Sequence, residues 1–346
     1  MNVTRTIDDI HFLPARMNTK FAGLRVVALG GGTGLPVVLR SLKDILFSSS
    51  QYIYEHDKDR LTAIVTVTDD GGSSGRLRKE FNILPPGDIR NCLSALSENS
   101  ALSSDLFQYR FGKGDGLNGH SLGNLLLAAL TDLKGNFLEA IRCCGKIMDV
   151  RGQVLPFTTM NVSLAARFSD GYFIKGESSI AKHKGSIYRV FLHPSFPDPL
   201  PQAIDAIEKA DVIIIGPGSL YTSIIPNLLV KGIALAIERS RAKKIYICNL
   251  MTEPGETDDY TVSDHVKAIF DHSEHGLFQY VVINKGKISA DLQENYIKQD
   301  YYPVTYTLEE IKDLGLTSIV ADVISEQDQK IRHDPDKLGR LFREIL

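Results

Sequence analysis

The sequence predicts an α/β fold in which a mostly parallel β-sheet is covered by helices on both faces. Short apolar runs typical of buried strands recur along the chain, at 24–29, 61–67, 212–215, 245–248, 280–283 and 319–324. Between them lie stretches with apolar residues every three or four positions, typical of amphipathic helices, at 89–96, 121–130, 137–148 and 202–209. Strands that alternate with helices form parallel sheets, because each crossover helix packs on a face of the sheet.

Length and composition fit a large soluble domain. The chain has 346 residues, of which 43% are hydrophobic and 23% charged, enough to bury a full core. We expect residues 1–20 to form a flexible leader and residues 21–346 a single domain. A net charge of −3 offers no basic footprint for nucleic acid. No apolar run has membrane-spanning length and no signal-peptide pattern opens the chain, so we expect a cytoplasmic protein.

One region, at about 158–192, departs from the alternation of strands and helices. Apolar and polar residues alternate there as in antiparallel strands, and Asp170-Gly171 fits a hairpin turn. We therefore expect a small antiparallel β excursion on the main sheet.

A glycine-rich turn follows the first predicted strand. Gly30, Gly31, Gly32, Thr33 and Gly34 lead directly into a predicted helix with apolar residues on one side. Glycines let backbone N–H groups approach a ligand closely, and a helix N-terminus favours negative charge. The turn lacks the sixth-position glycine of the dinucleotide fingerprint and the Gly-Lys-Ser/Thr of a Walker A loop. We favour a nucleotide or phospho-ligand site over a purely structural turn.

A second glycine turn follows the strand at 212–215. Gly216, Pro217, Gly218 and Ser219 repeat the pattern of the first turn in the other half of the chain. Two such turns on one sheet suit a ligand that lies across the crevice between the halves. We expect Gly216, Gly218 and Ser219 to contact it. Asn249, at a later strand end, either lines the same edge or starts a turn, and Arg332 either reaches a diphosphate or is solvated.

Asp69 and Asp70 follow the second predicted strand. An acidic residue at this place can bind ribose hydroxyls. Two carboxylates could instead hold Mg²⁺, which prefers oxygen ligands. A polar turn without a ligand is the third alternative.

Four helix starts are predicted from capping residues. Asp88 and Ser121 are expected as N-caps, and Asp334 as the N-cap before Pro335. Thr307, followed three residues later by a glutamate, fits a capping box.

Polar residues near two of these starts are candidate ligand contacts: Arg90, Asn91, His120 and Asn124. The sequence around Ser121 also fits the G-x-S-x-G nucleophile elbow, but no strand precedes it, which argues against a hydrolase.

Several long blocks together resemble the YvcK family of gluconeogenesis factors, within the CofD-like superfamily named for 2-phospho-L-lactate transferase. The blocks are GGGTGLPVVLRSLK, TAIVTVTDDGGSSGRLR, PPGDIRNCLSALS, LFQYRF, GHSLGNLLLAALT, GPGSLYTSIIPNLLV and PGETDDYTVSDHV, in order from about Arg25 to Asn284. The family's glycine turn falls on Gly31–Gly34, its acidic motif on Asp69 and Asp70, and its second turn on Gly216–Ser219. Glu253 stands where YvcK-type sequences are expected to have glutamine.

The resemblance implies a Rossmann-like CofD fold and a cytoplasmic binder of UDP-sugars, notably UDP-N-acetylglucosamine. It links the chain to the routing of carbon into cell-wall (peptidoglycan) precursors and to cell shape. An enzyme of amino-sugar synthesis is a candidate partner, and a homo-oligomer is one candidate assembly.

Two other functions stay open. A CofD-type enzyme would use a divalent metal to transfer a phospholactyl group from a guanylyl-diphospho donor to a deazaflavin. A dinucleotide-binding oxidoreductase follows from fold analogy alone.

Overall fold

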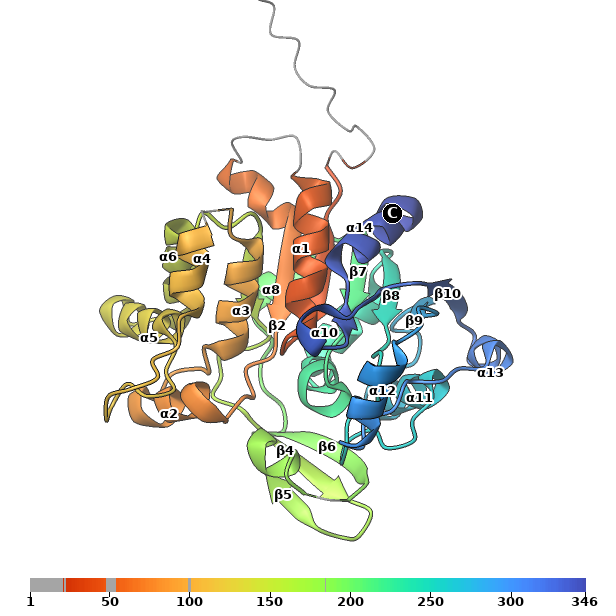
Figure 1. Cartoon of the computed structure of the whole chain (residues 1–346). Coiled ribbons are helices and arrows are strands. Elements are labelled where there is room, and N and C mark those ends of the chain that lie inside the picture. Colours follow the sequence, from red (N-terminus) through yellow and green to blue (C-terminus); the bar gives the residue numbers. More distant parts are fainter. Residues whose placement is uncertain (1–20, 22, 48–53, 99–100, 184) are drawn as a thin grey trace, which may run out of the picture.

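The computed structural model describes residues 21–346 apart from 22, 48–53, 99–100 and 184. The predicted leader, residues 1–20, lies outside the described residues. Figure 1 shows helices gathered around a central sheet, with a smaller sheet projecting from one end of it.

Seven parallel strands form the central sheet, in the order β10-β9-β8-β7-β1-β2-β3. They are β1 (Val26–Gly30), β2 (Leu61–Val65), β3 (Gln153–Pro156), β7 (Val212–Ile215), β8 (Lys243–Ile247), β9 (Tyr280–Asn284) and β10 (Thr317–Ala321). β1 lies beside β7, with Val26 opposite Val212. After β1, the next strands along the chain, β2 and β3, are added on one side of it. After β7, the next strands, β8, β9 and β10, are added on the opposite side, so the direction in which the sheet grows reverses between β1 and β7. In parallel sheets, ligands bind at the carboxyl ends of strands at such a reversal.

Helices cover both faces of this sheet, as predicted. α1 (Gly34–Leu46) connects β1 to β2 and packs against α3 (Gly87–Leu96) and α14 (Pro335–Ile345). α10 (Lys231–Arg239) connects β7 to β8 and packs against α8 (Pro201–Glu208). Because crossovers are right-handed, connections that progress in opposite directions place their helices on opposite faces. The apolar stripe expected after the first turn is buried on α1: Leu35, Val38, Leu39, Leu42 and Ile45.

The smaller sheet confirms the predicted antiparallel excursion. Its strands are β4 (Ser163–Phe168), β5 (Phe173–Lys175) and β6 (Ile187–His193), in the order β5-β4-β6. Gly171 makes the predicted hairpin turn, with a φ of +92° and an N–H that donates to the Phe168 carbonyl at 3.0 Å.

The remaining elements connect these sheets. The helices are α2 (Gly72–Phe81), α4 (Ala101–Gln108), α5 (Leu122–Lys134), α6 (Phe137–Ile147), α7 (Glu177–Ile180), α9 (Ile225–Leu228), α11 (Val262–His272), α12 (Ala290–Ile297) and α13 (Leu308–Asp313), with 3-10 turns at Glu55–Arg60 and Gln327–Gln329 and a π-helix at Leu220–Ile224. A two-stranded ribbon pairs β11 (Ile324–Ser325) with β12 (Arg332–His333).

Across the described residues, no single helix is long and apolar enough to cross a membrane. The helices Leu220–Leu228 and Lys231–Arg239, which are bent by 75° relative to each other, pass that test only as a pair.

Two elements differ from the prediction. β3 was not predicted: it is as short as β7, but it begins with the half-buried Gln153, ends in proline and lies at the sheet edge. The strand expected at 319–324 splits into β10 and β11. Asp322 lies at the break, where its Oδ1 accepts the Ile324 N–H at 3.3 Å.

Helix capping follows the prediction at two of the tested starts. Ser121 and Asp334 accept backbone N–H groups as N-caps of α5 and α14. Thr307 precedes α13 as expected, but its side chain makes no cap bond, so the capping box is wrong. A reciprocal capping box instead joins Thr261 and Asp264 at the start of α11.

Candidate functional site

The two glycine turns lie against each other at the reversal between β1 and β7. A Cβ at Gly34 would overlap the Pro217 carbonyl oxygen, so only glycine allows this approach. Gly32 and Gly218 have φ values of +60° and +157°, in the region that favours glycine. The turn geometry therefore explains why both segments are rich in glycine.

A cavity of about 480 Å³ opens over these turns. The structure brings seven of the predicted residues together on its lining: Gly32, Thr33, Gly34, Gly218, Ser219, Asn249 and Arg332. Gly31 and Gly216 lie outside the lining. A Cβ at Gly31 would meet Asp88 at 2.8 Å, and one at Gly216 would meet the Ile247 carbonyl oxygen at 2.9 Å. These two glycines serve close packing of the turns.

The opposite wall of the cavity comes from residues that were not predicted as ligand contacts. It includes Glu253, Tyr296, Gln299, Tyr301 and Lys330. The rings of Tyr296 and Tyr301 meet edge to face with centroids 5.8 Å apart. The Tyr296 hydroxyl accepts the Ile331 N–H at 3.0 Å, which ties α12 to the strand that carries Arg332. No local motif marks these residues as a site. The one hint in the sequence is that two basic residues, Lys330 and Arg332, flank Ile331.

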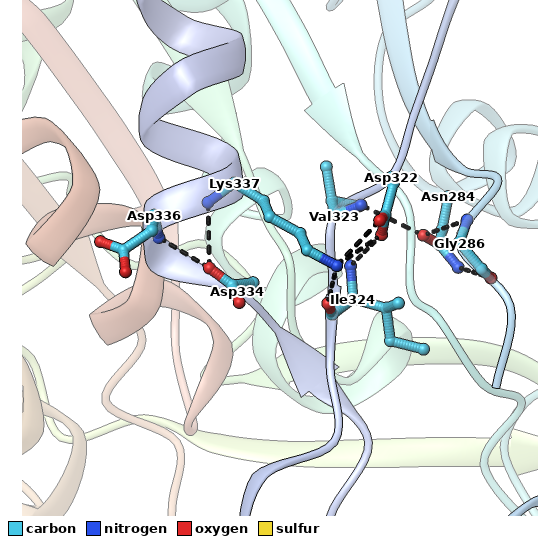
Figure 2. A network of polar contacts seen from close by, with 8 residues as sticks. All are labelled: Asn284, Gly286, Asp322, Val323, Ile324, Asp334, Asp336 and Lys337. Carbon is cyan, nitrogen blue, oxygen red and sulfur yellow. Dashed lines mark hydrogen bonds and ion pairs between the residues drawn. The ribbon is translucent and has the colours of Figure 1, made fainter. Parts of the chain in front are cut away.

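A polar network fixes the segment that carries this wall (Figure 2). The Lys337 ammonium donates to both Asp322 carboxylate oxygens, at 2.9 and 2.8 Å, and to the Ile324 carbonyl at 2.8 Å. The Asn284 side chain accepts the Val323 N–H at 3.2 Å. The network thereby joins the end of β9, the ribbon β11–β12 and α14, and positions Arg332 beside the glycine turns.

Asp88 fixes the first glycine turn through a hydrogen bond to its backbone. Its Oδ2 accepts the Gly32 N–H at 2.9 Å. Burial raises the pKa of Asp88 to about 6, against the opposing effect of the Gly32 hydrogen bond. The predicted N-cap role is wrong, because α3 begins at Gly87 and its N-cap is Pro86. The Asp88 carboxylate instead bonds to Gly32 in the first glycine turn.

The other polar candidates form a mostly buried cluster beyond Asp88, and Asn91 connects it to the first glycine turn by donating to the Gly32 carbonyl at 3.5 Å. Arg90 donates to Ser121 Oγ at 2.5 Å, to Asn91 Oδ1 at 2.7 Å and to Asn124 Oδ1 at 3.3 Å. Ser73 Oγ lies 2.9 Å from His120 Nδ1 and accepts from Asn124 at 3.0 Å. None of Arg90, Asn91, His120 and Asn124 lines the cavity. Their polar atoms largely satisfy one another, and their role as ligand contacts stays a prediction.

Asp69 and Asp70 lie beyond the end of β2 and bond in different directions. Asp69 Oδ1 accepts the Gly71 N–H at 2.9 Å within its own turn. Asp70 Oδ1 accepts the Ser178 N–H at 2.8 Å from the smaller sheet's α7. Within the described residues, no group of three or more His, Cys, Asp or Glu side chains could hold a metal ion.

Further carboxyl groups are buried near both regions. Burial raises the pKa of Glu177, which accepts from the Thr68 hydroxyl at 3.1 Å. Burial next to Glu253 raises the pKa of Glu256 to about 8. A carboxyl group held protonated at neutral pH can donate as well as accept a hydrogen bond. Burial also raises the pKa of Glu253, which stands where glutamine was expected, against the opposing effect of its hydrogen bond with Ser219.

Comparison with known proteins gives matches over almost the whole chain. The sequence model of the CofD family, described as 2-phospho-L-lactate transferase CofD, matches residues 26–324. The gluconeogenesis factor of Bacillus subtilis is 48% identical over 322 residues, covering 93% of this chain and 98% of that protein. The gluconeogenesis factor of Halalkalibacterium halodurans is 49% identical over 319 residues, covering 92% and 95%.

A solved structure supports the same relationship. The crystal structure of a Bacillus halodurans protein superposes with a TM-score of 0.86 at 49% identity, covering 92% of this chain and 99% of that one. A second crystal structure, described as a UPF0052 family protein from the same organism, gives a TM-score of 0.85. The family model, the relatives and the fold agree, and the chain belongs to the CofD family, in its branch of gluconeogenesis factors.

Proposed function

We propose that this chain is a cytoplasmic regulator that binds a nucleotide sugar of the UDP-N-acetylglucosamine type without turning it over. In this role it links carbon metabolism to the synthesis of cell-wall precursors and to cell shape, acting on an enzyme of amino-sugar synthesis. The observation that carries the proposal is the cavity of about 480 Å³ bounded by both glycine turns at the reversal of strand order. The gluconeogenesis-factor names of the relatives support the metabolic role.

The cavity lining suits the parts of such a ligand. Backbone N–H groups of the turns and the N-terminus of α1 favour a diphosphate, and Lys330 and Arg332 add positive charge on the facing wall. The Gly32 N–H is engaged by Asp88, so the phosphates would use neighbouring amides. Tyr296 and Tyr301 offer ring surfaces to a base, and Asn249 and Glu253 offer hydrogen bonds to sugar hydroxyls.

Calorimetric titration and thermal unfolding with UDP-N-acetylglucosamine test this proposal. A ligand that binds only the folded state stabilises it by about 2.7 kcal/mol at roughly 100 times its Kd. Arg332→Ala should weaken binding by about tenfold, and Arg241→Ala, at an exposed arginine outside the cavity, should leave it unchanged. The absence of any shift at millimolar ligand would refute binding, and a product that accumulates over hours would refute the regulator role.

Mg²⁺ belongs to the proposal as a partner of the ligand phosphates. Magnesium in proteins commonly uses one or two carboxylates together with phosphate oxygens. Asp69 and Asp70 bond in different directions, so we expect unequal effects from Asp69→Asn and Asp70→Asn. Titrations in Mg²⁺ and in EDTA separate metal binding from ribose binding: only a metal ligand loses the Mg²⁺ dependence. Equal, wild-type affinity in both variants would remove this motif from the site.

A CofD-type transferase is the second candidate, favoured by the description of the matching family. Mass spectrometry of the ligand that copurifies with the native protein separates the alternatives. A UDP-sugar supports the regulator, a deazaflavin the transferase, and a nicotinamide dinucleotide an oxidoreductase.

A further inference from the structure

The outer face of the smaller sheet combines aromatic and cationic side chains. In the register of the sheet, Ala165 on β4 lies between Lys175 on β5 and Phe191 on β6. Two residues farther along β4, Arg167 lies between Phe173 on β5 and Arg189 on β6. Because side chains alternate between faces along a strand, these positions share one face. Figure 1 shows this sheet, with β4, β5 and β6 labelled, projecting from the body at the bottom of the view.

The exposed aromatic side chains on this sheet do not serve the core. The opposite face of the sheet is filled by Leu164, Ala166, Phe168, Val190 and Leu192, all 3% exposed or less. By contrast, 64% of Phe173 and 37% of Phe191 remain exposed, and their ring centroids lie 6.3 Å apart across the small Ala165. Tyr188, which is 66% exposed at the register shift on β6, does not belong to this face: it borders a pocket together with Tyr221 and Asp264 of the main body. Exposed aromatics gathered on one face mark an interaction surface.

The cations on this face are free of local acidic partners. Arg167, Lys175 and Arg189 are exposed and form no ion pair within the described residues. The carboxylate at the adjoining hairpin, Asp170, bonds to His183 at 3.0 Å instead. The face is therefore positive in a chain whose net charge is −3.

We propose that the outer face of β4, β5 and β6 is a docking surface for a protein segment that presents acidic residues around an apolar side chain. The apolar side chain would pack on Phe173 and Phe191 above Ala165, and the acidic groups would pair with Arg167, Lys175 and Arg189. A second copy bound through the same face would bring like charges together, which costs free energy. A nucleic acid would face the net negative charge of the whole chain, unlike a local acidic segment.

The position of this surface connects it to the candidate site. Asp70 accepts the Ser178 N–H and Glu177 accepts the Thr68 hydroxyl, so both bonds join the smaller sheet's α7 to the segment after β2. On its other side, Gly255 lies against the His183 carbonyl, where a Cβ would come within 3.0 Å. A partner on the sheet would thus sit beside the loops at the carboxyl edge of the main sheet. The proposal does not require a nucleotide-sugar ligand.

Peptide display against the immobilised full chain tests the proposal. A random peptide library is selected without nucleotide, and the most enriched peptide is synthesised and titrated by fluorescence anisotropy. We expect peptides with several Asp or Glu residues around an aromatic or aliphatic residue. Their Kd should rise about tenfold or more in Phe173→Ser and in the double variant Arg167→Glu/Arg189→Glu.

Matched variants control for non-specific effects. Phe196→Ser removes an aromatic that is 85% exposed but lies outside the three strands, and Arg241→Glu reverses a charge on the main body. Both should bind the peptide as the wild type does, and a Lys-for-Glu peptide should bind the double variant better than the wild type. Circular dichroism and thermal unfolding verify that each variant is folded.

Four results would overturn the proposal. The first is that no enriched peptide depends on this face, and the second is that the control variants lose as much peptide affinity as the test variants. The third is self-association of the chain that Phe173→Ser abolishes. The fourth is binding of a poly-uridine oligonucleotide that Arg167→Glu/Arg189→Glu abolishes. The peptide assay contains no UDP-sugar, so its failure leaves the nucleotide-sugar titration unaffected.

Discussion

The carboxyl edge of the central sheet has two regions that handle polar groups in opposite ways. Over β1, β7 and β8, glycine backbone and a few side chains border an open cavity of about 480 Å³. Beyond the end of β2, at the starts of α3 and α5, Arg90, Ser121 and Asn124 are buried and bonded to one another. Both regions carry sequence motifs rich in glycine and polar residues, but only the motifs of the cavity region directly follow predicted strands.

The difference shows that polar residues in glycine-rich motifs have two distinct uses. In the cavity region, Asp88 and Asn249 accept the Gly32 and Gly218 N–H groups, but the rest of the turn backbone borders open space, because glycine keeps side chains out of the way. In the cluster region, the side chains mainly satisfy buried partners and fix the position of neighbouring turns. We therefore expect variants in the cavity region to affect ligand binding, and variants in the cluster region to affect stability.

The largest effect is expected where the two turns touch. In Gly34→Ala the new Cβ overlaps the Pro217 carbonyl oxygen, so the backbone of one turn must shift. We expect a loss of about 1–3 kcal/mol in the free energy of unfolding, with loss of nucleotide binding. Gly112→Ala is the control, because nothing lies within 4 Å of its new Cβ. Urea unfolding and ligand titration measure both effects, and a wild-type result for Gly34→Ala would mean that the turns do not touch as described.

An arginine from each region tests the contrast directly. Arg90→Met leaves buried acceptors without a donor, which should cost about 1–3 kcal/mol of stability while the folded fraction keeps its ligand affinity. Arg332→Ala should weaken binding and change stability by less than about 0.5 kcal/mol, since the side chain is exposed. Parallel unfolding and titration experiments decide. A stable Arg90→Met variant without affinity would move the ligand site into the cluster.

The smallest effect concerns Asp88, which bridges the two regions. Its pKa is raised from 3.8 to about 6, so the folded state prefers the protonated carboxyl group. Stability from this group is therefore complete below about pH 4 and is lost as the pH rises through about 6. Asp88→Asn keeps an acceptor for the Gly32 N–H but cannot ionise. We expect it to be more stable than the wild type at pH 7.5, by on the order of 1 kcal/mol.

Unfolding curves of the wild type and Asp88→Asn between pH 4 and 7.5 measure this difference. Titrating groups without an electrostatic interaction with Asp88, such as His333, cancel in the comparison, whereas Glu177, whose pKa the Asp88 charge raises, contributes to the difference. A constant difference across the range would show that Asp88 does not titrate there.

Much of the fold was predictable from local patterns. The inner strands are continuous apolar runs, and β7 was predicted with its observed bounds, because strands buried on both faces leave little ambiguity. Both glycine turns were found because strand, glycine and helix follow one another in sequence. That the turns touch could not be read from either one, since it depends on β1 and β7 being neighbours.

The errors arise where long-range contacts override local preference. Asp88 fits an N-cap by its position, yet its carboxylate bonds Gly32 across the fold. Thr307 fits the capping-box pattern without forming it, whereas Thr261 and Asp264 form one with aspartate in place of glutamate. Tyr296 and Lys330 line the cavity only because tertiary contacts bring the last segments back to the first strand.

The cavity wall that carries Arg332 has a consequence for the order of folding. Gly32 belongs to the first strand–helix unit, and Arg332 to the ribbon just before the last helix, which itself packs against α1 through the bond from Ser41 Oγ to the Pro335 carbonyl. Contacts between segments so distant in sequence form late, because the intervening chain must be ordered first. We therefore expect the complete cavity only in chains whose first and last segments have both docked on the sheet. Under the proposed function, a ligand held there would link the first and last segments and slow unfolding from either end.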